Sequence, residues 1–140
     1  MSKMEVLDYF PTDDDGYTLD AYIQALPKVH NEVRLSFRPT YVTDRAQLVE
    51  ANRKLDETKF AKYLSEWTAK HLVSWSIHQK VKGVMIPMPI TAENILKLKP
   101  QLWTKLTGIV CWGEGGDQDP VVSEDTTERS DATVDQLQKN

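Results

Sequence analysis

The stretch GYTLDAYIQALPKVHNEVRLSFRP, residues 16–39, contains two short runs in which apolar and polar residues alternate. Alternation with a period of two is typical of a β-strand with one buried face. A short polar connection, PKVHNE, joins the two runs, so the stretch predicts a β-hairpin. Pro39 ends the second strand because proline cannot donate a hydrogen bond to a strand ladder. The predicted buried faces comprise Tyr17, Leu19, Ala21, Ile23 and Ala25 in the first run and Val33, Leu35 and Phe37 in the second.

The chain after this hairpin is predicted to be mainly helical. No glycine or proline occurs between Thr43 and Val73, and apolar residues recur there mainly at helical spacing. A polar stretch, DETK at 56–59, interrupts the pattern. The region therefore predicts either one long helix or two helices broken near Asp56, with Thr43 capping the first helix and Thr58 the second.

The segment VSWSIHQKVKGVMIPMPI, residues 73–90, predicts either a short hairpin or an extended connection, because its weak alternation is interrupted by glycine and proline. Thr91 is predicted to cap a short helix that follows. Pro100 suits the first turn of a last helix, where its missing N–H would have no partner. Gly113 is predicted to end that helix. The apolar face of the last helix comprises Leu102, Trp103, Leu106, Ile109 and Val110.

These elements define one small α+β domain over residues 16–112, preceded by a flexible N-terminus at residues 1–15. Residues 113–140 contain eight acidic residues against two basic ones, a net charge of −6, and few apolar side chains. Burial of so little apolar surface does not offset the entropy of ordering. The segment 113–140 is therefore predicted to be a disordered acidic tail.

The composition also argues against several classes of protein. The single cysteine rules out a disulfide within the chain and fits a reducing compartment. The charge balance gives no large basic excess, so nucleic acid is not an expected partner. No apolar run approaches the roughly 20 residues of a membrane-spanning helix, and the N-terminus lacks the apolar core of a signal peptide. We expect a soluble intracellular chain without a membrane partner.

No group of residues has the spacing that catalysis or metal binding requires. His30, His71 and His78 do not form a zinc-ligand pattern, and Cys111 lies between two apolar residues without a neighbouring base. The acidic run that ends at Gly16 does not match a calcium loop. There is no phosphate-binding loop and no nucleophile elbow. The sequence therefore predicts no catalytic residue, no metal ligand and no cofactor, and a protein that is not an enzyme.

The four tryptophans differ in their predicted environments. Trp67 and Trp103 lie on helical apolar faces and are expected in the core. Trp75 and Trp112 lie at the ends of elements. They are either core residues or partner-binding anchors, because aromatic side chains dominate interaction hot spots.

The predicted parts follow one another in an order marked by Arg38, Pro39, Trp75, Gly83, Pro87, Thr91 and Pro100. This order resembles that of the small tail assembly chaperones and related tail-module proteins of long-tailed, siphovirus- or myovirus-like bacteriophages. The resemblance covers roughly residues 16–120. One departure is Ser76, where an acidic residue often follows the tryptophan. Most of the residues that carry the resemblance are expected where a strand, turn or helix begins or ends.

The resemblance implies a chaperone that passively binds the tape-measure protein in the host cell cytoplasm. Such a protein keeps its client soluble while the tail-tube protein assembles around it, and it is absent from the finished particle. A longer form often arises by ribosomal frameshifting, and codons for Gln138, Lys139 and Asn140 can contain a slippery heptamer. The alternative is a structural tail or head–tail completion protein retained in the virion. A small regulatory protein that binds a host factor is a further alternative, and a homo-oligomer is compatible with the apolar content.

Overall fold

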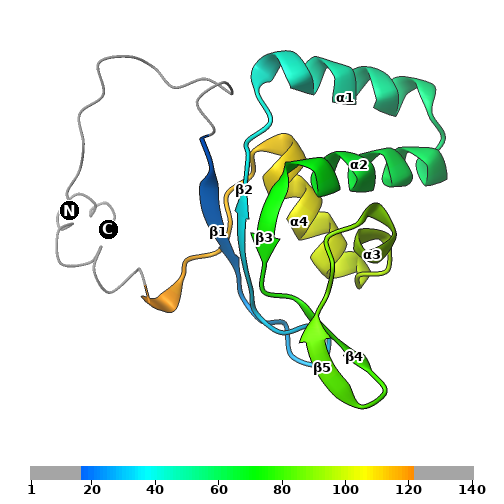
Figure 1. Cartoon of the computed structure of the whole chain (residues 1–140). Coiled ribbons are helices and arrows are strands. Elements are labelled where there is room, and N and C mark those ends of the chain that lie inside the picture. The colour runs from blue at the N-terminus through cyan, green and yellow to red at the C-terminus, as the bar shows by residue number, and fades with distance from the viewer. Residues whose placement is uncertain (1–16, 122–140) are drawn as a thin grey trace, which may run out of the picture.

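The computed structural model describes residues 17–121 and shows an α+β domain, as predicted (Figure 1). The N-terminus predicted to be flexible and the tail beyond Val121 lie outside the described residues. The elements in chain order are β1 (Leu19–Ile23), β2 (Val33–Phe37), α1 (Val42–Lys54), α2 (Glu57–His71), β3 (Leu72–Trp75), β4 (His78–Val81), β5 (Val84–Pro87), α3 (Ala92–Leu96) and α4 (Pro100–Trp112).

The predicted N-terminal hairpin is confirmed, and it forms part of a larger antiparallel sheet. β1 pairs with β2 in a register that runs from Leu19 opposite Phe37 to Ile23 opposite Val33. β3 adds a third strand on the other side of β2, giving the order β1-β2-β3. The sequence did not predict this strand, because it is short, follows α2 without a break and pairs with a segment far away in the chain.

Residues 73–90 were predicted to form a short hairpin or an extended connection. After β3, this segment forms a hairpin of β4 and β5 that is separate from the three-stranded sheet. Its two-residue turn places Lys82 at φ 53° and Gly83 at φ 82°. Two successive residues with positive φ are what the tight turn of a two-residue hairpin requires. The hairpin projects away from the rest of the domain (Figure 1).

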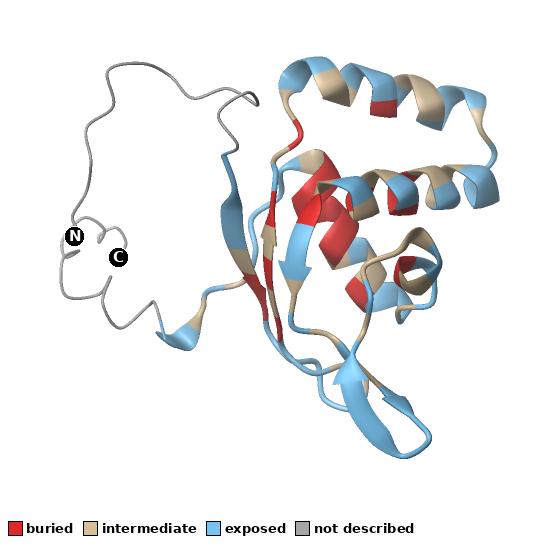
Figure 2. Cartoon of the chain, viewed as in Figure 1, coloured by how far each residue is buried: buried red, intermediate tan, exposed pale blue. Residues whose placement is uncertain are grey.

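Helices cover one face of the three-stranded sheet, and the main hydrophobic core lies between them (Figure 1). Buried residues concentrate in β2 and α4 (Figure 2). A second, smaller cluster joins α1, α2 and α4 through Leu48, Leu64 and Cys111. The main cluster comprises Ile23, Val33, Leu35, Phe37, Leu72, Ile95, Leu102, Leu106, Ile109 and Val110.

The region predicted as one or two helices contains two, with a break at Leu55 and Asp56. The prediction that Thr58 caps the second helix is wrong. Asp56 takes that position, because its extended backbone lets the carboxylate accept a hydrogen bond from the Lys59 amide at 2.8 Å. Thr43 does not cap α1 either, since the helix begins one residue earlier, after Tyr41.

The other predicted helix ends are confirmed. The Thr91 hydroxyl accepts a hydrogen bond from the Asn94 amide at 3.1 Å at the start of α3. Pro100 is the first residue of α4. Gly113 follows α4 in the left-handed conformation, with φ 72°, which glycine adopts without steric cost.

The prediction that the folded domain ends at Trp112 places the boundary too early. Residues 114–119, here called the strap, turn back from α4 and lie along β1 (Figure 1). Tyr22, predicted on the exposed face of β1, is only 7 % exposed. Polar contacts rather than apolar burial hold the strap, and a prediction based on apolar content therefore misses it.

Leu106 gives a test of the core, because it is fully buried in α4. We expect Leu106→Ala to lower the free energy of unfolding by about 2–5 kcal/mol, since it leaves a cavity between α4 and the sheet. Leu96→Ala in α3 is the matched control: this leucine is 42 % exposed, and the cost should stay below about 0.5 kcal/mol. Chemical denaturation would measure both values, and equal costs would contradict the assignment of the core.

Candidate functional site

The face of the sheet opposite the helices is polar and carries a single guanidinium near its centre. Because side chains alternate along a strand, Arg34 lies on this outer face while its neighbours Val33 and Leu35 point into the core. Tyr22 lies directly opposite Arg34 on β1. The backbone N–H of Arg34 also donates to the Ser76 hydroxyl at 2.9 Å, which fixes the chain directly after β3.

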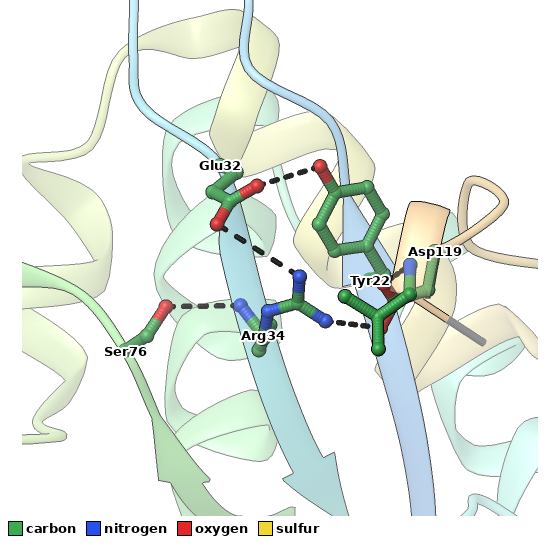
Figure 3. Close-up of polar contacts among 6 residues, drawn as sticks. Tyr22, Glu32, Arg34, Ser76 and Asp119 are labelled. Atoms are coloured by element: carbon green, nitrogen blue, oxygen red, sulfur yellow. Dashed lines mark hydrogen bonds and ion pairs between the residues drawn. The ribbon is translucent and has the colours of Figure 1, made fainter.

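Arg34 holds together a cluster of polar side chains (Figure 3). Its guanidinium forms an ion pair with Asp119 of the strap and a longer one with Glu32, at 3.9 Å. The guanidinium carbon also lies 4.8 Å from the centre of the Tyr22 ring, within range of a cation–π interaction. The Tyr22 hydroxyl donates a 2.7 Å hydrogen bond to Glu32, and this bond raises the pKa of Tyr22.

Asp117 attaches the strap to the edge of β1. Its backbone N–H donates to the Tyr22 carbonyl at 2.7 Å, and its carboxylate accepts from the Gln24 amide at 2.8 Å. The carboxylate also pairs with Lys105 of α4 at 3.1 Å. The Gln24 hydrogen bond, with a smaller contribution from Lys105, lowers the pKa of Asp117.

Gly116 explains how the strap approaches the strand so closely. A Cβ atom at this position would lie 2.7 Å from the Tyr22 carbonyl oxygen, closer than real Cβ contacts allow. Any other residue would push the strap away from β1 and lengthen the Asp117–Tyr22 hydrogen bond. Gly116 is therefore required by the packing here, whereas a Cβ at the preceding Gly115 would meet nothing within 4 Å.

A cleft of about 690 Å³ remains between the strap and the outer face. Its walls offer hydroxyls, carboxylates, exposed backbone and one guanidinium, so its chemistry is that of hydrogen bonding and charge pairing. Within residues 17–121, no group of three or more His, Cys, Asp or Glu side chains is placed to hold a metal ion. Besides the strap residues, the cleft is lined by Asp20, Ala21, Tyr22, Arg34, Leu35, Ser36 and Ser74.

A second surface of different character lies on the β4–β5 hairpin. Val81 pairs with Val84, and Gln79 pairs with Ile86, so Val81, Val84 and Ile86 share one face of the hairpin. These three side chains, here called the hairpin strip, are 42 %, 59 % and 37 % exposed. Figure 2 shows the hairpin as an exposed arm.

The two tryptophans considered as partner anchors are largely used inside the fold. The Trp75 indole donates a hydrogen bond to the Met88 carbonyl at 2.7 Å, and its ring packs against the main core cluster. Trp112 packs against the smaller cluster around Leu48. Neither lines the cleft.

The residues that carry the family resemblance do not form one site. Arg38 donates a 3.0 Å hydrogen bond to the Lys70 carbonyl just after β2, and Pro39 follows it. Gly83 makes the hairpin turn and Pro87 ends β5. Together with the helix starts at Thr91 and Pro100, they mark the boundaries of elements across the whole domain.

The histidines also occupy separate places. The His71 ring stacks on Trp67 with 5.2 Å between ring centres and bonds the Trp67 carbonyl. His30 lies in the turn after β1 and bonds the Asn31 carbonyl. His78 starts β4 and bonds the Ser76 carbonyl. Each has a local backbone partner, which is the role of a structural histidine.

Sequence reasoning did not find the Arg34 cluster, because its members come from distant parts of the chain. Asp119 is 85 residues away from Arg34, and Asp117 is 93 residues away from Gln24. The one local signal is the sequence GEGGDQD after α4, which combines glycines for close approach with two aspartates two residues apart. Such a pattern is also typical of a solvated tail, so it does not indicate docking by itself.

Strap docking is expected to depend on pH through Asp117. Its pKa is lowered in the folded state, so the docked strap is favoured above the ordinary value near 3.8 and loses this contribution as pH falls through the lowered value. An NMR titration of the Asp117 carboxyl should give a midpoint below 3.8. At pH 7, Asp117→Asn should speed hydrogen exchange of the Gln24 amide, whereas the remote charge change Glu66→Gln should not. Unchanged exchange in Asp117→Asn would contradict this docking.

Cys111 is expected to be inert in the folded protein. It is fully buried, contacts the Thr68 hydroxyl at 3.3 Å, and burial raises its pKa to about 11. Ellman's reagent at pH 8 should therefore modify the native thiol at least roughly a hundredfold more slowly than the unfolded one. Because the folded pKa is raised, stability should decline as pH rises from about 9 toward 11, and Cys111→Ser should remove this decline. Rapid native labelling would show that the smaller cluster opens.

Comparison of the chain with protein-family models, with curated proteins and with solved structures finds no match. Within the described part of the chain, no helix is both long enough and apolar enough to cross a bilayer.

Proposed function

We propose that this protein is a passive protein-binding chaperone that covers an apolar segment of its partner, and that the partner is the tape-measure protein of a long-tailed bacteriophage. The observation that carries the binding proposal is the exposed hairpin strip, formed by Val81, Val84 and Ile86. The resemblance in element order supports the choice of partner and the host cell cytoplasm as the place of action.

The hairpin supports a binding role because its shape and composition do not suit an isolated element. A two-stranded hairpin is at best marginally stable alone in water, and this one presents its valines and isoleucine to solvent. Contiguous exposed apolar residues rimmed by polar ones commonly mark interaction surfaces. Gln79, on the same face as the strip, and Lys82, in the turn, are its polar neighbours.

Helices α2 and α4 are less suited to hold the partner, because their apolar faces are already used. Leu102, Leu106 and Val110 of α4 are buried against the sheet, and Leu64 of α2 is buried in the smaller cluster. We therefore place the client on the hairpin and not in a groove between helices. A client segment would add its own apolar face to the hairpin strip.

The strength of such binding should suit a temporary holder. Full burial of one valine or isoleucine side chain contributes about 1.5–3 kcal/mol, and the three strip residues are already partly covered. The gain in binding free energy is therefore modest, and the entropy lost on association offsets part of it. A client held in this way can be released when tail-tube subunits compete for it, without nucleotide hydrolysis.

Val84→Lys tests the proposal, because it places a charge in the middle of the hairpin strip. We expect at least tenfold weaker binding to the tape-measure protein, which corresponds to about 1.4 kcal/mol. Val49→Lys is the matched control, since Val49 of α1 is 56 % exposed and Val84 is 59 % exposed. Co-expression of each variant with the tape-measure protein, followed by affinity purification, would measure the bound fraction.

Equal loss of binding in the two variants would show that the hairpin is not the binding surface. No binding by the unchanged protein would remove the tape-measure protein as the client. Mass spectrometry of purified particles separates the alternative: a chaperone should be absent from them, whereas a structural tail or head–tail completion protein should be present. The same spectra, taken on lysates, would reveal a frameshifted longer form.

A further inference from the structure

Polar contacts hold the strap to the domain. No side chain between Gly113 and Val121 is buried. Its contacts include the bond from the Glu114 amide to the Gly108 carbonyl, two hydrogen bonds at Asp117, and the ion pairs with Lys105 and Arg34. Both ion pairs remain partly exposed to water, and such pairs add little stability, so we expect the strap to undock at a lower cost than unfolding of the core.

The strap also leaves part of its surroundings uncovered. Tyr22 directs its carbonyl toward the outer edge of β1, and Asp20, two residues earlier, directs its backbone groups to the same side. Among the described residues, the bond from Asp117 to Tyr22 is the one backbone hydrogen bond at this edge. The cleft of about 690 Å³ lies beside it.

We propose that the β1 edge, together with Arg34 and Lys105, is a binding site for an extended segment of a partner protein that bears two carboxylates two residues apart. The strap is the internal occupant of this site and competes with the partner. The segment would add to the sheet edge, a recurring mode of peptide recognition in which main-chain bonds give affinity and side-chain contacts give specificity.

The contacts of the strap define what the site recognises. Its Asp117 shows where one carboxylate meets Lys105 and the Gln24 amide. Its Asp119 shows where the second meets Arg34 (Figure 3). In an extended segment these two positions are about 6.6 Å apart. A ligand with larger side chains than the strap could also fill the cleft that the strap leaves open.

The open cleft favours a partner protein over a second copy of this chain. The strap of a second copy would make the same contacts as the chain's own strap. It would bind less favourably, because it lacks the covalent link through α4 that tethers the chain's own strap to the site. The tether gives the internal strap an effective concentration in the millimolar range for a short linker. Well below millimolar concentration, only a segment that makes further contacts, such as contacts within the cleft, gains enough to displace it, whereas the strap sequence itself can compete only in millimolar excess.

The experiment uses the full-length chain and two fluorescein-labelled peptides. The probe has the sequence of residues 113–121, GEGGDQDPV, and the control probe is GEGGNQNPV. In fluorescence anisotropy, the variant Asp117→Asn/Asp119→Asn, whose own strap is weakened, should bind the acidic probe at least tenfold more tightly than the unchanged protein does. The control probe should stay at background. Adding Arg34→Gln and Lys105→Gln to that variant should remove binding.

A second measurement does not depend on the variants being folded. In the unchanged protein, a millimolar excess of the acidic probe should shift the NMR amide signal of Gln24, and the control probe should not. Equal effects of the two probes, or none, would overturn the proposal and leave the strap as a fixed part of the fold. Dimerisation of the unchanged protein that Asp117→Asn/Asp119→Asn abolishes would identify a second copy as the occupant and overturn the assignment to a partner. Neither result bears on the hairpin, which Val84→Lys tests separately.

Discussion

Helix α4 is the constraint on which the rest of the structure depends, because it is buried on two sides. Leu106, Ile109 and Val110 belong to the main cluster beneath the sheet, whereas Cys111 belongs to the smaller cluster with α1 and α2. The carbonyl of Val110 also accepts a 2.8 Å hydrogen bond from the buried Thr40 hydroxyl. That hydroxyl in turn accepts from the Trp67 indole at 2.9 Å. One helix therefore fixes the sheet, the crossing from β2 to α1, and the position of α2.

The position of α4 also determines what remains on the surface. Helices occupy one face of the sheet, so the other face is left to polar side chains and to the strap (Figure 1). The strap begins where α4 ends: Gly113 turns the chain, and the Glu114 amide bonds back to the Gly108 carbonyl at 3.0 Å. Within residues 17–121, no helix covers the β4–β5 hairpin, and its apolar residues stay exposed (Figure 1).

How much of this fold could be predicted depends on how local each signal is. The alternation from Leu19 to Phe37 gave the first hairpin correctly, since both strands and their turn are adjacent in the chain. Caps at Thr91, Pro100 and Gly113 were equally local. The third strand was missed because Leu72–Trp75 becomes a strand only by pairing with β2. The contact between Asp119 and Arg34 was missed for the same reason, so the candidate site could not be predicted. The apolar residues of the β4–β5 hairpin are visible in the sequence, but the sequence does not show that they are exposed.

The two surfaces differ in chemistry in a way that matches two kinds of binding. The hairpin strip is apolar and has no directional contacts, so it suits a client recognised by its hydrophobicity. The edge of β1 offers directional hydrogen bonds and two cations, which suits recognition of a sequence. The strap is compatible with this second role because it is polar: Gly116 has no side chain to bury against Tyr22, and Asp117 and Asp119 form contacts that water and salt can replace. A strap held by buried apolar side chains would dock more permanently, and the edge of β1 would then be less available to another segment.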